Sequence, residues 1–506
     1  MLKLRFRDPF KLQDDFFDGM SKLNVLSLRG ERYQASILPL PAYVQSLSNL
    51  RTLCLSHLKL DDISIIGELV TLQILSIRDS VLKELPVEIG NLTNLIMLQF
   101  WDHSQGDLKR ISPNVLSRLV QLEELHMVGV KKFSYSTFRE LESLSRLSSL
   151  TLSECSEDVI YSNLGLSSRL TRYALKVGRA GRYLDTSLME KMMDLVVSES
   201  TPLGDWISHM LREREYVFSS GKGSKNVLPE LLLGGFQNMK HLRLAACDSL
   251  THLLKIHSDN IPFPKLQRLE VHFCASLQYL FSGGMVQDIK FPYLYELHLE
   301  SLHCLTHFFS DNVEGIEFPL LRKMHFNGLQ EFQNFWPSAN NSSTISNPLF
   351  HGKVCCPNLE ELAVSWADSI SALCSHQHAT AYFRKLRELK VHTCEKLRNL
   401  MFPSVARGLN NLRRLDLYGC LSMEEVITEE EQEIMTNEPL FHLLEQLVIH
   451  NLLKLRHFFL TKRALEFPFL SVVYISECPQ MKTFVPGSLS TPNLKQVNYD
   501  VFVLRK

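Results

Sequence analysis

The sequence predicts an α/β solenoid, with a curved parallel sheet on the concave side and short helices and irregular turns on the convex side. Three observations predict it. Apolar residues recur at fixed offsets within short segments, these segments repeat every 26 to 28 residues over much of the chain, and a proline often precedes them. One such segment cannot bury its own apolar face, so neighbouring coils must stack on it.

The segment from Asn411 to Ile427 shows the offsets most clearly. Its apolar residues, at offsets 0, 3, 5, 8, 11 and 14, are Leu412, Leu415, Leu417, Cys420, Met423 and Val426. Leu415 and Leu417 have strand spacing, because alternate residues of a strand face the same side. The later steps of three keep one apolar side chain per turn pointing inward. This is the pattern of a leucine-rich repeat.

Residues 1–177 carry the most regular repeats. Their predicted strand cores are Leu23-Leu26-Leu28, Leu50-Leu53-Leu55, Leu72-Leu75-Ile77, Leu95-Leu98-Phe100, Leu122-Leu125-Met127, Leu147-Leu150-Leu152 and Leu170-Tyr173-Leu175. Between them the chain returns over the convex side, where Pro86 and Pro113 interrupt any long helix. We therefore expect single helical turns and irregular turns on that side.

The period is hard to follow in residues 178–235. Thr186–Val197 is expected to form either a short helix or a variant coil. Pro202–Arg212 predicts a helix, because Trp206 and Met210 lie four residues apart on one face. The composition of Ser219–Asn226 predicts a loop. Together these segments predict a continuous but irregular stretch of solenoid.

The repeats become regular again in residues 236–506. In six coils a proline stands two residues before the first apolar position: Pro264, Pro292, Pro319, Pro357, Pro468 and Pro492. Proline favours an extended residue before it, which suits entry into a strand, and the phenylalanine that often precedes it is expected to cap the previous coil. Two longer coils contain a polar loop, Ser338–Thr344, and an acidic run, Glu429–Glu433, which should bulge from a rim or the convex side.

Composition narrows the class of protein. The 506 residues carry a formal net charge of −1, so no bulk field draws the chain to nucleic acid or an anionic membrane. No apolar run reaches the roughly 18 residues of a membrane helix, and the N-terminus lacks the features of a secretory signal. Five of the 11 cysteines lie at offset 8: Cys247, Cys274, Cys394, Cys420 and Cys478. We interpret them as small buried hydrophobes in a reducing compartment.

Several ordered phrases go beyond the generic repeat. They are Phe16–Met20, Leu50–Leu55, Asp62–Leu69, Lys83–Leu95 and Ile111–Met127, together with the Phe-Pro-x-Leu coils and the acidic insert. With these phrases, nearly the whole chain resembles the leucine-rich-repeat region of plant intracellular disease-resistance proteins of the coiled-coil NB-ARC class. The resemblance implies a cytoplasmic protein that recognises a pathogen effector or a guarded host protein, and that autoinhibits the NB-ARC switch.

The chain departs from that family in having no coiled coil or NB-ARC domain. It contains neither the phosphate-binding pattern G-x-x-x-x-G-K-[ST] nor the Met-His-Asp triplet that closes an NB-ARC domain; Gly221–Ser224 lacks the required first glycine. ADP or ATP is therefore expected only in the missing domain. The chain looks like a fragment or truncated gene model whose Met1 lies near the start of the repeat region.

Signals for other chemistry are weak. A zinc site could be drawn from Cys355, Cys356, Cys374, His376 and His378, but no C-x-x-C or H-x-x-x-H spacing supports it. No Ser/His/Asp set or carboxylate pair converges in sequence, so we expect neither a metal site nor an enzyme.

The stronger functional signal is positional. Offsets 4 and 6 flank the inward strand residue, so their side chains should leave the concave sheet. At offset 4 these residues are Arg243, Glu270, His298, His325, Lys390, Asp416 and Tyr474; at offset 6 they are His272, Glu300, Asn327, Ser365, His392, Tyr418 and His450. Charged residues mixed with His and Tyr suit protein recognition. The bland alternative is a face that only keeps the protein soluble.

Two other functions stay open. A leucine-rich-repeat substrate adaptor of a ubiquitin ligase would show an F-box helical module, and none is visible before Phe16. An extracellular receptor is disfavoured by the missing secretory signal and by the odd number of cysteines.

Overall fold

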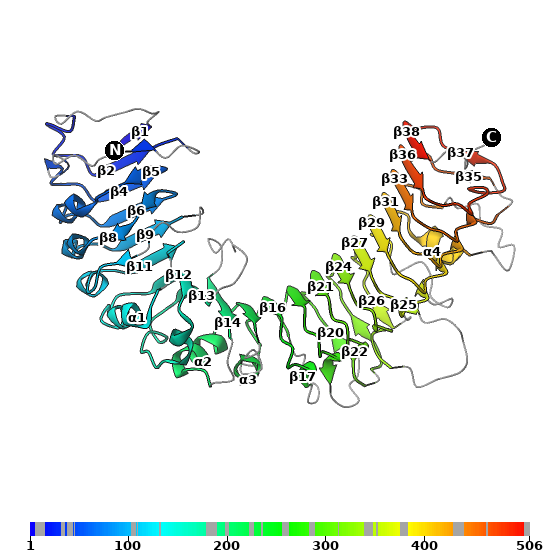
Figure 1. Cartoon of the computed structure of the whole chain (residues 1–506), viewed down its shortest axis with the longest axis horizontal. Helices are drawn as coiled ribbons and strands as arrows, with labels where there is room; N and C mark the ends of the chain where they lie inside the picture. Colours follow the sequence, from blue (N-terminus) through cyan, green and yellow to red (C-terminus); the bar gives the residue numbers. More distant parts are fainter. Residues whose placement is uncertain are drawn as a thin grey trace. The chain divides into compact units, whose positions relative to one another are not determined.

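The computed structural model groups the chain into two compact units, Met1–Gly234 (unit 1) and Gly235–Lys506 (unit 2) (Figure 1). It describes residues 1–5, 16–31, 36–37, 44, 46–102, 108, 110–130, 133–178, 190–197, 202–221, 227–233, 236–255, 263–282, 289–311, 313–337, 348–350, 353–374, 383–428, 440–461 and 464–499. The predicted polar loop at 338–344 and the acidic run at 429–433 lie outside these residues. No helix in the described segments has the length and apolar character needed to cross a membrane.

One parallel sheet runs through unit 1. Its strands are β1 (Leu2–Arg5), β2 (Val25–Arg29), β4 (Thr52–Ser56), β6 (Ile74–Arg78), β9 (Met97–Trp101), β11 (Glu124–Val128), β12 (Ser149–Cys155), β13 (Arg172–Val177), β14 (Lys191–Val196) and β15 (Tyr216–Ser220). Each strand pairs in parallel with the next in this order. The predicted strand cores are confirmed, since leucines such as Leu53 and Leu75 are fully buried and pair in register.

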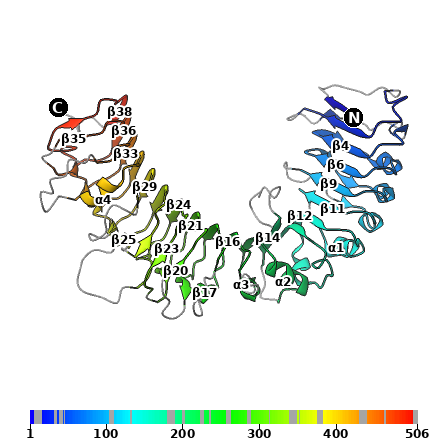
Figure 2. The ribbon, with the colours of Figure 1, turned by 180° about the vertical axis from the view of Figure 1, so that it is seen from behind.

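The other side of unit 1 carries the predicted single helical turns, which lie apart from the sheet in both views (Figures 1 and 2). They are η2 (Ser64–Glu68), η3 (Val87–Asn91), η4 (Leu116–Arg118) and η5 (Glu157–Tyr161), with the α-helix α1 (Tyr135–Glu142). Pro86 stands directly before η3 in an extended conformation. Short strands complete this side: β3 (Ser36–Ile37), β5 (Leu58–Leu60), β7 (Val81–Leu82), β8 (Glu84–Leu85) and β10 (Arg110–Ile111).

The irregular stretch of the sequence is resolved by tertiary pairing. Residues 191–196 form β14, so the variant coil expected for this segment is confirmed and the short helix is not formed there. The predicted helix is confirmed as α2 (Asp205–Arg212), which buries Trp206 and Met210. The predicted loop beginning at Ser219 is wrong for its first two residues, because Ser219 and Ser220 pair with β14 in the sheet. A further helix, α3 (Val227–Leu233), follows.

The parallel strands that carry the repeats of unit 2 are called here the main sheet of unit 2. Its strands are β16 (His241–Ala245), β18 (Arg268–His272), β21 (Glu296–Glu300), β24 (Lys323–Asn327), β27 (Glu361–Ser365), β29 (Glu388–His392), β31 (Arg414–Tyr418), β33 (Gln446–His450), β36 (Val472–Ser476) and β38 (Gln496–Tyr499). Pairing keeps the repeat in phase: Leu389 lies opposite Leu415, which lies opposite Leu447. Equal offsets of successive coils therefore form straight columns.

In unit 2, short strands take most of the places where short helices were expected. They are β17 (His252–Lys255), β19 (Tyr279–Ser282), β20 (Ile289–Lys290), β22 (His307–Phe309), β23 (Ile316–Glu317), β25 (Pro348–Phe350), β26 (Val354–Cys355), β28 (Ala372–Cys374), β30 (Asn399–Met401), β32 (Glu425–Ile427), β34 (His457–Phe459), β35 (Leu465–Glu466) and β37 (Leu489–Ser490). The described residues of unit 2 form one α-helix, α4 (Pro403–Gly408). These segments are rich in Phe, Val and Ile, which favour strands over helices.

The phenylalanines before the repeated prolines cap the preceding coils, as expected. Phe291 is buried and its ring centroid lies 5.8 Å from that of Phe281 in the coil before. Phe318 lies 6.2 Å from Phe308 in the same way, and it stacks on Phe291 at 5.2 Å. A column of aromatic rings thus joins the coils between the two layers of strands.

Candidate functional site

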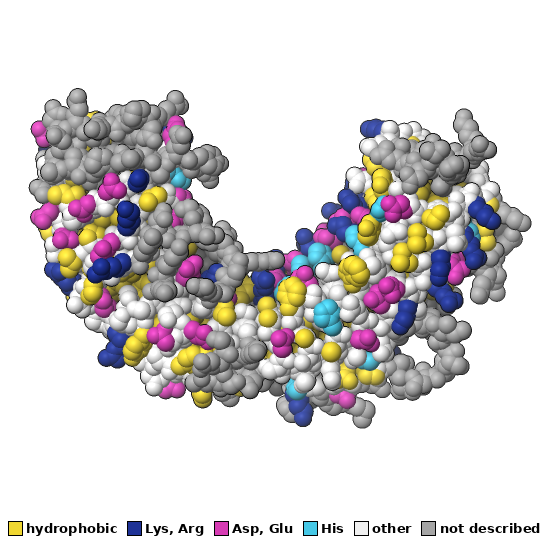
Figure 3. Space-filling model, viewed as in Figure 1, with side chains coloured by type: hydrophobic (Ala, Val, Ile, Leu, Met, Phe, Trp, Pro, Cys, Tyr) yellow, Lys and Arg dark blue, Asp and Glu magenta, His cyan; other side chains and the backbone are white. Residues whose placement is uncertain are grey.

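The strands of unit 2 alternate strictly between a core side and an outward side. In β18, Leu269 and Val271 are buried in the core, so Arg268, Glu270 and His272 project from the opposite side. We call this opposite side of the main sheet the sheet face. Figure 3 shows Lys, Arg, Asp, Glu and His side chains gathered along it.

The structure places every predicted site residue on the sheet face. Arg243 lies in β16; Glu270 and His272 in β18; His298 and Glu300 in β21; His325 and Asn327 in β24; Ser365 in β27; Lys390 and His392 in β29; Asp416 and Tyr418 in β31; His450 in β33; and Tyr474 in β36. The predicted stripe of His392, Tyr418 and His450 is a column of register partners. Use of these residues in binding stays a prediction.

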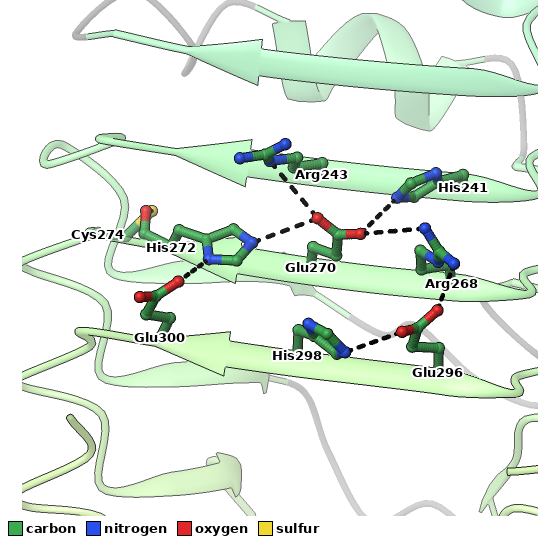
Figure 4. Close-up of polar contacts among 9 residues, drawn as sticks. All are labelled: His241, Arg243, Arg268, Glu270, His272, Cys274, Glu296, His298 and Glu300. Carbon is green, nitrogen blue, oxygen red and sulfur yellow. Dashed lines mark hydrogen bonds and ion pairs between the residues drawn. The ribbon is translucent and has the colours of Figure 1, made fainter. Parts of the chain in front are cut away.

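Glu270 is the centre of a dense cluster (Figure 4). Its carboxylate oxygens lie 3.2 Å from Nε2 of His241, 3.4 Å from Nε2 of His272 and 3.5 Å from Nε of Arg243. Burial raises the pKa of Glu270, but hydrogen bonds from the two histidines and the charge of Arg243 outweigh burial and hold this pKa far below its usual range. Glu270 is therefore a fixed anion.

The cluster continues across the next strands. Arg268 contacts Glu296 at 2.5 Å, and Glu300 accepts a hydrogen bond from Nδ1 of His272 at 2.8 Å (Figure 4). Offset 4 then carries two histidines in succession, His298 and His325, whose rings stack with their centroids 4.4 Å apart. Burial and the neighbouring His325 lower the pKa of His298. Neutral imidazoles can stack in this way, whereas two imidazolium ions would repel each other.

Two carboxylates flank that histidine pair. Nε2 of His298 lies 3.0 Å from Glu296, and Nε2 of His325 lies 3.0 Å from Glu361. Glu361 also meets Lys323 at 3.5 Å, and its net pKa is lowered: burial raises it, while His325 and Lys323 outweigh burial. The pair thus sits between two carboxylates, and the lowered pKa of Glu361 favours the ionised form of that one.

The last strands change from ionic to aromatic contacts. Asp416 lies 2.9 Å from Arg414 and 3.3 Å from His392. Beyond it, the rings of Tyr418 and His450 lie 5.1 Å apart, and those of His450 and Tyr474 lie 5.9 Å apart. The sheet face therefore has an ionic part from β16 to β31, and an aromatic part from β31 to β36.

Sequence reasoning missed a third column, at offset 2. It consists of His241, Arg268, Glu296, Lys323, Glu361, Glu388 and Arg414. These residues supply partners for the predicted ones, as when Glu388 meets Lys390 at 2.9 Å. The same alternation that marked offsets 4 and 6 extends to offset 2, so the signal was present in the sequence.

The offset-8 cysteines support the sheet face from behind. The thiols of Cys247, Cys274 and Cys478 donate to the carbonyl oxygens of Ala245, His272 and Ser476, each at 3.3 Å. All 11 cysteines are free. Hydrogen bonding with Cys247 and burial raise the pKa of the Cys274 thiol, so it stays protonated. These thiols bind the carbonyl group of the last residue of their own strands, β16, β18 and β36.

The geometry of the described residues does not build a metal centre. Among them, no group of three or more His, Cys, Asp or Glu is arranged to hold a metal ion. Of the zinc candidates, Cys356 and Cys374 are buried free thiols, and His376 and His378 lie outside the described residues. The sheet face offers fixed charges, hydrogen-bonding groups and aromatic rings.

Comparison with known proteins identifies the family. The model for a leucine-rich repeat region matches residues 17–331, and the model for plant disease resistance protein RPS2-like leucine-rich repeats matches residues 355–498. A probable disease resistance protein of Arabidopsis thaliana is 30% identical over 137 residues. That match spans 26% of this chain and 13% of the length of the relative.

Three solved structures match this chain at low sequence identity. A leucine-rich-repeat protein of Leptospira interrogans is 18% identical, with 81% of this chain and 87% of that chain covered and a TM-score of 0.41. The functional domain of InlJ from Listeria monocytogenes is 14% identical, with 81% and 71% covered and a TM-score of 0.43. The Arabidopsis receptor kinase HAESA, solved with a peptide hormone and a co-receptor, is 14% identical, with 93% and 75% covered and a TM-score of 0.40.

The repeat pattern, the stacked parallel strands and the two family matches agree. The chain belongs to the leucine-rich-repeat family, and it is the leucine-rich-repeat region of a protein of the plant disease-resistance type.

Proposed function

We propose that this region recognises a protein partner through the sheet face of unit 2, as part of a cytoplasmic plant immune receptor of the coiled-coil NB-ARC class. The partner is a pathogen effector or a guarded host protein. In the full receptor the same region contacts the NB-ARC domain and holds that switch inactive. The region itself binds no nucleotide and catalyses no reaction; ADP or ATP belongs to the NB-ARC domain.

The observation that carries this proposal is the aromatic part of the sheet face. Tyr418 is 42% exposed, and its side chain takes no part in the leucine core behind the strand. His392, His450 and Tyr474 extend the aromatic column on both sides of it. Exposed tyrosines ordered by their neighbours are typical of binding hot spots, because they bury a large area at little entropic cost.

The ionic part of the sheet face supports a role in specificity. Its carboxylates already meet arginine, lysine or histidine side chains, so a partner gains little from bulk charge alone. A partner must instead match the fixed pattern of donors and acceptors. Matched polar patterns of this kind fix register and exclude wrong partners more than they add affinity.

The test uses the full-length receptor in a leaf cell-death assay at matched protein levels. The triple variant His392→Ala, Tyr418→Ala and His450→Ala should abolish the response to the cognate trigger or cause death without it. Loss of one hot-spot contact commonly costs more than about 1 kcal/mol of binding free energy, so the loss of three contacts should be enough to prevent recognition. A thermal melt should show that the fold is kept.

The matched control uses three exposed residues at offset 10, Glu331→Ala, Lys396→Ala and Lys454→Ala, which lie in turns outside the sheet face. This variant should signal like the parent. If the sheet-face variant also signals normally, both with and without the trigger, the sheet face is only a solvated surface and the proposal fails.

A further inference from the structure

The residue that follows each main-sheet strand of unit 2 from β16 to β36 adopts a left-handed backbone. These offset-7 residues are Ala246, Phe273, Ser301, Gly328, Trp366, Thr393, Gly419, Asn451 and Glu477. The reason is local: the N–H of Phe273 still donates to Glu300 O at 2.9 Å, and that of Trp366 to His392 O at 3.0 Å, while the chain turns inward to offset 8. Glycine and asparagine suit this conformation.

Phe273 and Trp366 do not suit it. Their φ values are 55° and 54°, where a bulky side chain is strained. Their side chains are also not used in the core, since the residues are 54% and 50% exposed. Backbone preference and core packing would both favour a small residue at these two positions. A strained backbone that carries an exposed aromatic side chain therefore indicates a functional role for these two residues.

The two rings lie on one line at the rim of the sheet. The strand ends His272, Glu300, Asn327 and Ser365 are successive register partners, so Phe273, Ser301, Gly328 and Trp366 follow in the same order. We call these four residues the aromatic rim. Three strand spacings of about 4.8 Å place the two outer Cα atoms about 14 Å apart. Only a serine and a glycine stand between the two rings.

One carboxylate lies beside this row. Glu300 directly precedes Ser301, and its side chain is 39% exposed. Glu300 is paired with a histidine, His272. Glu296, on the same strand, is paired instead with an arginine, Arg268. The other three strand-end residues beside the aromatic rim are His272, Asn327 and Ser365, so Glu300 supplies the carboxylate of this row. The rim therefore presents two rings and one anion toward a partner.

We propose that the aromatic rim and Glu300 bind an extended segment of a protein partner that carries a lysine or arginine and an apolar side chain about four residues away. The cation lies between Glu300 and the face of Phe273, where both the carboxylate and the ring quadrupole attract it. The apolar side chain covers Trp366. This inference rests on the proposed function and names the chemistry of its partner.

The experiment begins with random dodecapeptides on phage, selected on the full chain and counter-selected on Trp366→Gly. The selected peptides should share a lysine or arginine and an apolar residue at that spacing. One synthetic peptide is then measured by fluorescence anisotropy. Replacing its arginine by the neutral isostere citrulline should weaken binding about tenfold or more. Selection of acidic peptides, failure of selection, or self-association of the chain instead would overturn the proposal.

Glycine variants separate binding from folding. Phe273→Gly and Trp366→Gly should each weaken peptide binding about tenfold while the melting temperature is unchanged or higher, because glycine adopts the left-handed backbone without strain. Glu300→Gln should weaken binding of the arginine peptide and leave binding of the citrulline peptide unchanged. The matched control is Tyr293→Ser, an equally exposed aromatic residue outside the rim, which should bind normally. A clear fall in melting temperature in both glycine variants would make the rings structural and overturn the proposal.

The two proposals fail separately. If the triple sheet-face variant loses signalling in leaf tissue while the rim variants bind the selected peptides like the parent, the proposed function stands and the rim proposal is overturned. If peptide binding depends on the rim but the triple variant signals normally, the rim proposal stands and the proposed function of the sheet face is overturned.

Discussion

At the residue scale, the behaviour of the sheet face depends on neighbours from other coils. His298 is an example: it lies between Glu296 on its own strand and His325 on the next, with Glu270 and His272 on the strand before. Burial and His325 lower its pKa, and burial likewise lowers the pKa of His241. These histidines are kept neutral in the folded protein.

The first prediction concerns pH. As the pH falls below about 6.5, the unfolded chain takes up protons at these histidines that the folded chain binds less readily, so stability falls. The carboxylates Glu270 and Asp416 have lowered pKa values, so their contribution is lost only at more acidic pH. His298→Gln should therefore reduce the drop in urea midpoint between about pH 7.5 and pH 5.5.

The control is His303→Gln, an exposed histidine that hydrogen-bonds to the neutral Gln330. Its urea midpoint should change with pH as in the parent. An undiminished drop in the His298→Gln variant would mean that burial of this ring does not penalise its charged form.

At the element scale, one coil is a strand, an inward turn at offset 8 and a return. Leu389 and Leu415 occupy the same place in adjacent coils, lie opposite each other and are fully buried. Each therefore packs against residues of the coils on both sides. A coil has no core of its own, so the loss of one leucine affects its neighbours too.

The second prediction is that Leu389→Ala and Leu415→Ala each cost about 2–5 kcal/mol of unfolding free energy, the usual range for an emptied leucine site. Hydrogen exchange should rise in the mutated coil and the coils next to it, and stay unchanged in β4 and β6 of unit 1. Denaturant melts within about 0.5 kcal/mol of the parent would contradict the core assignment.

At the scale of the whole molecule, the chain is two units whose described strands contact chiefly the strands of the neighbouring coils. Such a fold offers long outward surfaces and few enclosed sites. Within it, Gly221 follows β15, and Lys222–Ser224 lie outside the described residues; the sequence of this segment lacks the first glycine of a phosphate-binding loop.

The third prediction is that the purified chain binds neither ADP nor ATP. Isothermal titration with each nucleotide, with and without magnesium, should give no heat beyond dilution, while a thermal melt verifies that the sample is folded. Binding in the micromolar range would place a nucleotide site in the repeats themselves and contradict the proposed division of roles.

The sequence by itself determined the repeat, its phase and the direction of each strand side chain. The spacing of Leu415 and Leu417 assigns them to the core and Asp416 to the sheet face, because alternation in a strand is a local property. The tertiary structure alone decided which outward residues meet: Glu270 contacts His241, 29 residues earlier, through the register of two coils. It also placed Ser219 in a strand and Phe273 and Trp366 in strained, exposed turns, because those outcomes depend on pairing with the neighbouring coil.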